Sequence, residues 1–199
     1  SLEWNVGNTS VSGMGQCFEQ VTPLHLATDT ASSATGRAVS PHLIRAVNGT
    51  LGEQANPEHW PALDMPDSYF KAVREGMFAV VNEPHGTAPK AQLDLPGMLM
   101  AGKTGSAQVR HVSRALRESG HFNSADLPWE YRPHALFICF APYDAPRYAT
   151  AVVIEHGNTG ADAAAPLARD IMRDTLLRDP ANRTTPPPEN VADAGSTIE

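Results

Sequence analysis

Residues 102 to 109 read Gly102-Lys103-Thr104-Gly105-Ser106-Ala107-Gln108-Val109. A cation, two hydroxyls and two glycines converge here within five residues. Two unrelated chemistries use such a cluster: one holds the phosphates of a nucleotide, and the other holds a substrate beside a nucleophilic serine. The sequence on either side of the segment distinguishes between them.

The first interpretation is a phosphate-binding loop, because residues Gly97 to Thr104 match the pattern G-x-x-x-x-G-K-[ST] in full. Such a loop lies between a strand and a helix, whose N-terminal amides bind the phosphates. Pro96 interrupts any strand on the approach, and the bulky Met98 and Met100 suit a phosphate loop poorly. A nucleotide-binding module therefore stays only as an alternative.

The second interpretation is a strand that forms one wall of an active-site cleft. In this arrangement Lys103 supplies positive charge, hydroxyl groups bind a substrate carboxylate, and Gly105 lets the substrate backbone lie close. The run Ser106-Ala107-Gln108-Val109 favours a strand over a helix, as this interpretation requires.

Composition indicates one globular domain, since 199 residues with 41% hydrophobic and 19% charged residues can bury a sizeable core. The net charge of −7 argues against nucleic acid as a partner. No apolar run reaches the length of a membrane span. Eight scattered histidines without a ligand motif predict no metal site, and no cofactor is expected. Cys139 lies in an apolar run and is predicted to be a small buried core residue.

Helix signals are clearest at Thr22-Pro23, an N-cap followed by proline at the first helical position, with Gly36 as the stop. We expect loop before this helix, a short extended segment from Ala38 to Val47, and loop from 48 to 66. Apolar spacing predicts a second helix from Asp67 to Val81, in which Gly76 is expected to permit a close contact.

Three strands are predicted next, over residues 101–112, 134–141 and 148–155, with the second covered on both faces. A last helix is expected from Ala163 to Arg178 with Leu167, Ile171 and Met172 facing inward. Residues 1–178 would form the folded part, and 179–199 a disordered tail. Helices followed by antiparallel strands and a covering helix define an α+β fold rather than the alternating order of a phosphate-loop protein.

The chain resembles the transpeptidase domain of penicillin-binding protein 2, the family of cell-elongation enzymes of Gram-negative bacteria. The segments that carry the resemblance run in family order over residues 1–178 and match its C-terminal half. They are Gly13-Met14-Gly15-Gln16, Val21 to Ala27, Pro41-His42-Leu43, Glu75-Gly76-Met77, Val80-Val81-Asn82, Gly86-Thr87-Ala88, Ala101 to Val109, Phe140 to Tyr143, and Glu155-His156-Gly157. The implied fold is the serine β-lactamase-like one, incomplete on its N-terminal side.

The resemblance implies serine acyl transfer, in which a D-alanyl-D-alanine stem peptide is cross-linked into peptidoglycan and β-lactams imitate the substrate. It implies that Lys103 gives electrostatic support and that Thr104 and Ser106 bind the terminal carboxylate. The Ser106 amide would form half of the oxyanion hole, with Gly105 giving backbone access and Gln108 lying near the cleft rim. Lys103 and Ser106 are thus the catalytic candidates, and membrane proteins of the elongation complex are implied partners.

The family's nucleophile motif, S-x-x-K, occurs here only as Ser68-Tyr69-Phe70-Lys71, and its second motif, S-x-N, does not occur. Ser68 lies too close to Lys103 and on the wrong side of the segment beginning at Gly13 to be that nucleophile. An exposed serine and a solvated lysine are the expected roles.

We therefore expect the nucleophile and the membrane anchor to lie upstream, at the periplasmic face of the inner membrane, and this chain alone to be inactive. A catalytically dead binding module is a further alternative.

Overall fold

The computed structural model describes residues 4–13, 20–109 and 123–179. Its centre is an antiparallel sheet of order β3-β4-β5, formed by β3 (Ala101–Ala107), β4 (His134–Ala141) and β5 (Tyr148–Ile154). Lys103 is paired with Ile138, and Phe137 with Val152, so the register runs unbroken across the sheet. The strands predicted from the sequence are confirmed, although β3 ends at Ala107 and the prediction beyond residue 109 lies outside the described residues.

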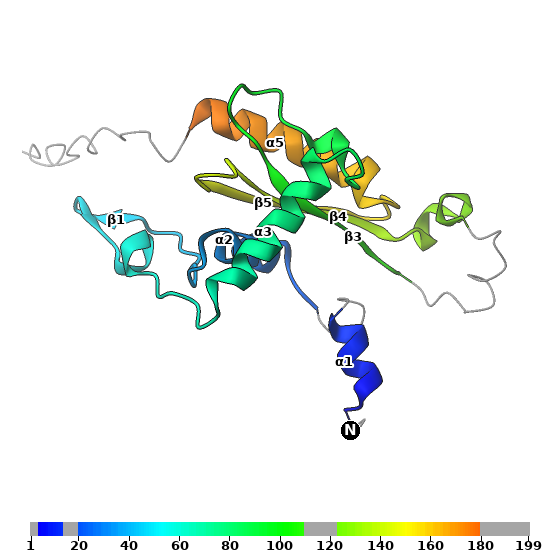
Figure 1. Cartoon of the computed structure of the whole chain (residues 1–199), viewed down its shortest axis with the longest axis horizontal. Coiled ribbons are helices and arrows are strands. Elements are labelled where there is room, and N and C mark those ends of the chain that lie inside the picture. The colour runs from blue at the N-terminus through cyan, green and yellow to red at the C-terminus, as the bar shows by residue number, and fades with distance from the viewer. Residues whose placement is uncertain (1–3, 14–19, 110–122, 180–199) are drawn as a thin grey trace, which may run out of the picture.

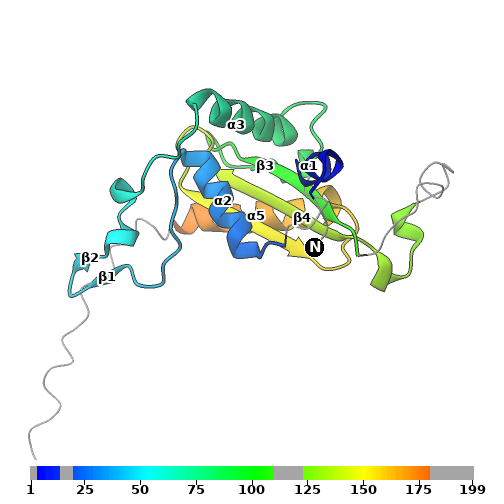
Figure 2. The same ribbon diagram turned by 90° about the horizontal axis from the view of Figure 1, so that it is seen from below.

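Three helices surround this sheet. The helices α2 (Pro23–Thr35) and α5 (Ala165–Arg178) cover its opposite faces, and α3 (Asp67–Asn82) runs beside β3 (Figures 1 and 2). Both α2 and α5 contact β4, which confirms that this strand is covered on both faces. No helix in the described ranges is long and apolar enough to cross a lipid bilayer.

Local sequence signals explain the ends of α2. The Thr22 hydroxyl accepts a hydrogen bond from the His25 amide at 3.2 Å, and the Thr22 amide donates to His25 Nδ1 at 3.4 Å. This reciprocal pair satisfies amides that the first helical turn cannot. Gly36 ends the helix at φ 69°, in the left-handed region that glycine favours. The predicted cap and stop of this helix are both confirmed.

A helix and one strand were missed in segments predicted as loop, and the strand that pairs with it lies at the end of the predicted extended segment from Ala38 to Val47. The helix α1 (Val6–Gly13) begins after Asn5, whose side-chain oxygen accepts from the Asn8 amide at 3.0 Å. The strands β1 (Ala46–Val47) and β2 (Thr50–Leu51) form a hairpin around Asn48-Gly49, both at positive φ. An asparagine N-cap and an Asn-Gly hairpin turn are the signals that would have identified them. Short 3₁₀ turns follow at Glu53–Ala55 and Pro57–His59.

The inward face of α5 differs from the prediction. Met172 is fully buried as expected, but Leu167 and Ile171 are each 48% exposed. The buried positions are instead Ala165, Ala168, Met172 and Leu176. Small residues let the helix approach β4 and β5 closely after a π-helical turn at Gly160–Ala164.

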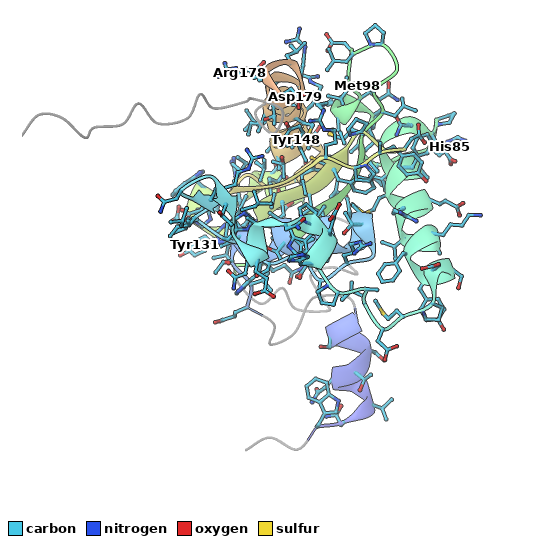
Figure 3. All side chains as sticks on the ribbon, turned by 90° about the vertical axis from the view of Figure 1, so that its left-hand side faces the viewer. His85, Met98, Tyr131, Tyr148, Arg178 and Asp179 are labelled. Carbon is cyan, nitrogen blue, oxygen red and sulfur yellow. The ribbon has the colours of Figure 1, made fainter. Side chains whose placement is uncertain are left out.

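The C-terminal end of α5 is fastened to β5 through Asp179. Tyr148 donates a hydrogen bond to the Asp179 carboxylate at 2.7 Å, and the two residues lie close together in Figure 3. Arg147 forms an ion pair with the same carboxylate at 2.6 Å. Asp179 therefore packs with the folded part, although the sequence placed the start of the tail at this residue. Residues 180–199 lie outside the described part of the chain, so the tail itself stays a prediction.

The two faces of the sheet carry unequal cores. The α5 face holds the larger cluster, which includes Val81, Met100, Phe137, Cys139 and Met172, all fully buried. The α2 and α3 face holds a smaller cluster formed by Ala34, Met77, Ala101 and Phe140. The domain is therefore closed on one side and thinly packed on the other.

Cys139 can be used to test the packing of the α5 face, because burial raises the pKa of its thiol from 9.0 to about 12. A Cys17→Ser variant removes the second cysteine. In this variant we expect a thiol reagent at pH 8 not to modify Cys139 while the protein is folded. The thiol ionises near pH 9 in the unfolded chain and only near pH 12 in the folded chain. The free energy of unfolding therefore falls as the pH rises between these two values. Reaction in the absence of urea would contradict the buried assignment.

Candidate functional site

The strand β3 presents the sequence-predicted site residues in order. Lys103 is exposed and its Nζ donates to the Thr104 carbonyl at 2.9 Å. Thr104 and Gly105 are half-buried, whereas Ser106 is exposed. Gln108 follows the end of the strand and is exposed, so it lies beyond the strand on which the sequence placed it.

Alternation along β3 divides these residues between the two faces of the sheet. Ala101 packs in the α2 and α3 cluster, which assigns Lys103 and Gly105 to the same face. A Cβ at Gly102 would collide with the ring of Phe137, on the α5 face, and Thr104 shares that side. The neighbouring side chains of Lys103 and Thr104 therefore project from opposite faces of one strand.

A groove of about 400 Å³ lies between α2 and α3 and includes Lys103 in its wall. The lining is mostly apolar, with Asp29 as the acidic residue among the described ones. It consists of Leu26, Asp29, Thr30 and Ser33 from α2, Ala72, Val73, Gly76, Met77 and Val80 from α3, and Lys103 and Ile138 from the sheet.

Gly76 widens this groove instead of permitting a close contact. Apart from the backbone of α3 itself, no heavy atom of the described residues lies within 4 Å of the position that a Cβ would occupy there. The sequence-based prediction of a close contact at Gly76 is therefore wrong for the described residues. The glycine leaves space at the centre of the α3 wall.

Glycine does permit a close contact behind the predicted site, at Gly160. A Cβ at Gly160 would overlap the Leu136 carbonyl oxygen and lie 2.8 Å from the Gly105 oxygen. The first residue of the π-helical turn therefore supports the backbone of β3 directly. Sequence reasoning gave Gly160 no role, because its neighbours are distant along the chain.

The turn after α3 brings a second hydroxyl to the strand. Thr87 Oγ1 lies 3.5 Å from Thr104 Oγ1. Further along this segment, Lys90 forms an ion pair with Asp162 at 2.7 Å. Hydrogen bonds from Lys90 and Thr159, together with the Lys90 charge, lower the pKa of the exposed Asp162 carboxyl. The sequence singled out Gly86-Thr87-Ala88 as a family segment but assigned it no function.

The geometry does not match the phosphate-binding alternative. Gly97 lies in a turn with φ +72°, and Lys103 and Thr104 lie inside a strand rather than at a helix N-terminus. Amides at a helix N-terminus are what such a loop uses to bind phosphate. Ser68 is exposed and outside the groove lining, and Lys71 pairs with Glu75 at 3.8 Å across exposed surface.

An antiparallel sheet between helices, with a Lys-Thr-Gly strand at its edge, defines an α+β domain of the penicillin-binding transpeptidase class. A family model described as "Penicillin binding protein transpeptidase domain" matches residues 1–173. The chain belongs to this family, within its penicillin-binding protein 2 branch.

Three relatives illustrate the similarity. The peptidoglycan D,D-transpeptidase MrdA of Haemophilus influenzae is 37% identical over 172 residues, which cover 85% of this chain and 26% of that protein. The structure of Pseudomonas aeruginosa PBP2 in complex with WCK 5153 has a TM-score of 0.66 at 32% identity, covering 87% of this chain and 34% of that one. Helicobacter pylori PBP2 in complex with MreC has a TM-score of 0.68 at 27% identity, covering 90% and 29%. The chain thus spans about a quarter to a third of these relatives.

We expect Gly160→Ala to lower the free energy of unfolding by about 1–3 kcal/mol, because the added methyl group must displace the backbone of β4 at Leu136 and of β3 at Gly105. Gly76→Ala is the matched control. It adds the same methyl group in open space inside a helix and should raise stability by about 0.5–1 kcal/mol. Urea denaturation measures both changes, and equal stability of the two variants would contradict the contact between Gly160 and Gly105.

Proposed function

We propose that this chain supplies one wall of the active site of a peptidoglycan D,D-transpeptidase. The observation that carries the proposal is that Lys103, Thr104, Gly105 and Ser106 follow one another on β3, an edge strand of the described sheet, with Lys103 in the wall of an open groove. In the proposed reaction, a serine hydroxyl attacks the carbonyl between the two terminal D-alanines of a stem peptide. The peptide C–N bond breaks, D-alanine leaves with a proton, and the amine of a second stem releases the acyl group.

Each site residue has a proposed role in this reaction. The Lys103 ammonium stabilises negative charge in the cleft, and the Thr104 and Ser106 hydroxyls bind the terminal carboxylate. The Ser106 amide donates to the oxyanion that develops on the attacked carbonyl. Gly105 lets the substrate backbone lie along the strand, and Gln108 lies just past the strand at the rim of the cleft.

The nucleophilic serine, in this proposal, comes from an upstream part of the same protein that docks on this one. Three features support that arrangement: the exposed position of Ser68, the thin core on the α2 and α3 face, and the groove that Gly76 widens. In addition, β5 is the last strand of the described sheet, with its edge available to a further strand. The chain alone is then inactive, because the cleft is divided between two parts.

The proposed partners, ligands and location of the protein are supported by its similarity to the relatives described above. The MreC complex of the Helicobacter pylori protein supports membrane proteins of the elongation complex as partners. The family's description supports penicillin and other β-lactams as ligands that acylate the completed cleft. We place this part of the protein at the periplasmic face of the inner membrane, where peptidoglycan is made.

We expect Lys103→Ala to slow acylation of the complete protein by penicillin about 10²–10³-fold, the usual effect of removing one group that stabilises developing charge. Lys71→Ala is the matched control and should leave the rate unchanged, because Lys71 lies on exposed surface away from the groove. Intact mass spectrometry after timed incubation follows the adduct. Normal acylation of the Lys103→Ala protein would refute the proposed function.

The same measurement on this chain alone tests where the nucleophile lies. We expect no adduct on the isolated chain and an adduct on an upstream serine of the complete protein. An adduct at Ser68 would show that the nucleophile belongs to this chain and that the divided cleft is wrong.

The groove provides a separate prediction. Gly76→Leu fills the space at the centre of the α3 wall, so it should block docking of the upstream part and reduce acylation of the complete protein. Lys71→Leu places the same side chain on α3 outside the groove and should preserve acylation. Equal rates for these two variants would contradict the groove as the docking surface.

A further inference from the structure

We propose that Thr87 is a positioning residue, whose hydroxyl orients that of Thr104 for the substrate carboxylate. The inference rests on the proposed function and deepens it at one residue. Its starting point is the distance of 3.5 Å between the two hydroxyl oxygens, which lie on segments 17 residues apart. Thr87 belongs to the Gly86-Thr87-Ala88 segment, to which neither the sequence nor the proposed reaction assigned a role.

The turn that carries Thr87 is fixed on both sides of this residue. The Gly86 amide donates to the Glu83 carbonyl at 2.9 Å, and the Ala88 amide donates to the Val80 carbonyl at 2.9 Å. A Cβ at Gly86 would overlap the Val80 carbonyl oxygen, so glycine alone lets the chain turn back against α3. Ala88 is fully buried. The Thr87 side chain therefore projects from a rigid support.

Further bonds hold this turn against the sheet. The Asn82 side-chain amide donates to the Phe78 carbonyl at 3.0 Å and to the Met100 carbonyl at 2.9 Å, which joins the end of α3 to the residue before β3. On the other side, Lys90 pairs with Asp162 in the turn whose Gly160 contacts Gly105. One set of contacts holds the end of α3 against the start of β3, and the other holds the segment after Thr87 against the turn that supports β3. Together they keep Thr87 next to Thr104.

The donors and acceptors of the two hydroxyls determine their roles. Each threonine hydroxyl has one proton to donate and two lone pairs. A carboxylate only accepts, so Thr104 must give its proton to the substrate and can then accept from Thr87. The resulting chain runs from Thr87 to Thr104 to the carboxylate, and each bond polarises the next. The distance of 3.5 Å is at the long limit for a hydrogen bond between two hydroxyls. Hydrogen bonds in active sites are often long before substrate binds and shorten in the complex.

A merely structural role for the Thr87 hydroxyl does not fit its surroundings. The side chain is exposed, so its loss costs little stability, and the turn is held by backbone groups that any residue at this position would leave in place. The effect of removing the hydroxyl should therefore fall on the bound carboxylate.

The test measures acylation rate constants of the complete protein with benzylpenicillin and with its methyl ester, in which the carboxylate charge is masked. We expect Thr87→Val to slow the reaction with benzylpenicillin about fivefold to tenfold, the effect of one ordinary hydrogen bond. The slow reaction with the ester should not change. Thr87→Ser keeps the hydroxyl and should restore the rate, and Thr50→Val on the exposed β2 should match the unaltered protein.

A double-mutant cycle completes the test. Thr87→Val should add nothing to the effect of Thr104→Val if the first hydroxyl acts through the second. Equal slowing with penicillin and its ester, or an unchanged penicillin rate in Thr87→Val, would overturn the positioning role while leaving the proposed function intact. Failure of penicillin to acylate the unaltered protein would overturn the proposed function and this inference with it.

Discussion

The packing of the Phe137 ring beneath Gly102 is the contact on which the arrangement of the site depends. The ring occupies the space in which any other residue at position 102 would place its Cβ. Because side chains alternate along a strand, this one contact fixes which face receives Lys103 and which receives Thr104. Pairing of Lys103 with Ile138 then holds the register along the rest of β3.

The unequal cores explain why the proposed groove lies beside Lys103. On the α5 face, small helical residues bring α5 close to the sheet and bury Met172 and Phe137 completely. On the opposite face, α2 and α3 stand apart and leave the groove beside Lys103. Rigid support thus lies on one side of the strand, and the open groove that we propose as a docking surface lies on the other.

Local signals in the sequence predicted much of this fold, and distant neighbours account for most of what they missed. The N-cap Thr22 and the C-cap Gly36 predicted both ends of α2. The apolar run of β4 predicted a strand that is covered on both faces. The exposure of Leu167 depends on which face of α5 meets the sheet, and helical periodicity alone does not show this. For the candidate site, the motif predicted the strand that carries Lys103 to Ser106. Contacts made by Thr87 and Gly160 join segments far apart in the chain, so no local pattern could reveal them.

The outer edge of β5 has a consequence for anyone who handles this chain by itself. From Ala149 to Ile154 the strand contains neither lysine nor proline, the residues that proteins commonly use to keep sheet edges from pairing with one another. Two copies can therefore align their edges and extend the sheet from one molecule into the next. Self-association of the chain alone should increase with concentration, and a lysine at an outward position of β5 is the change that would reduce it.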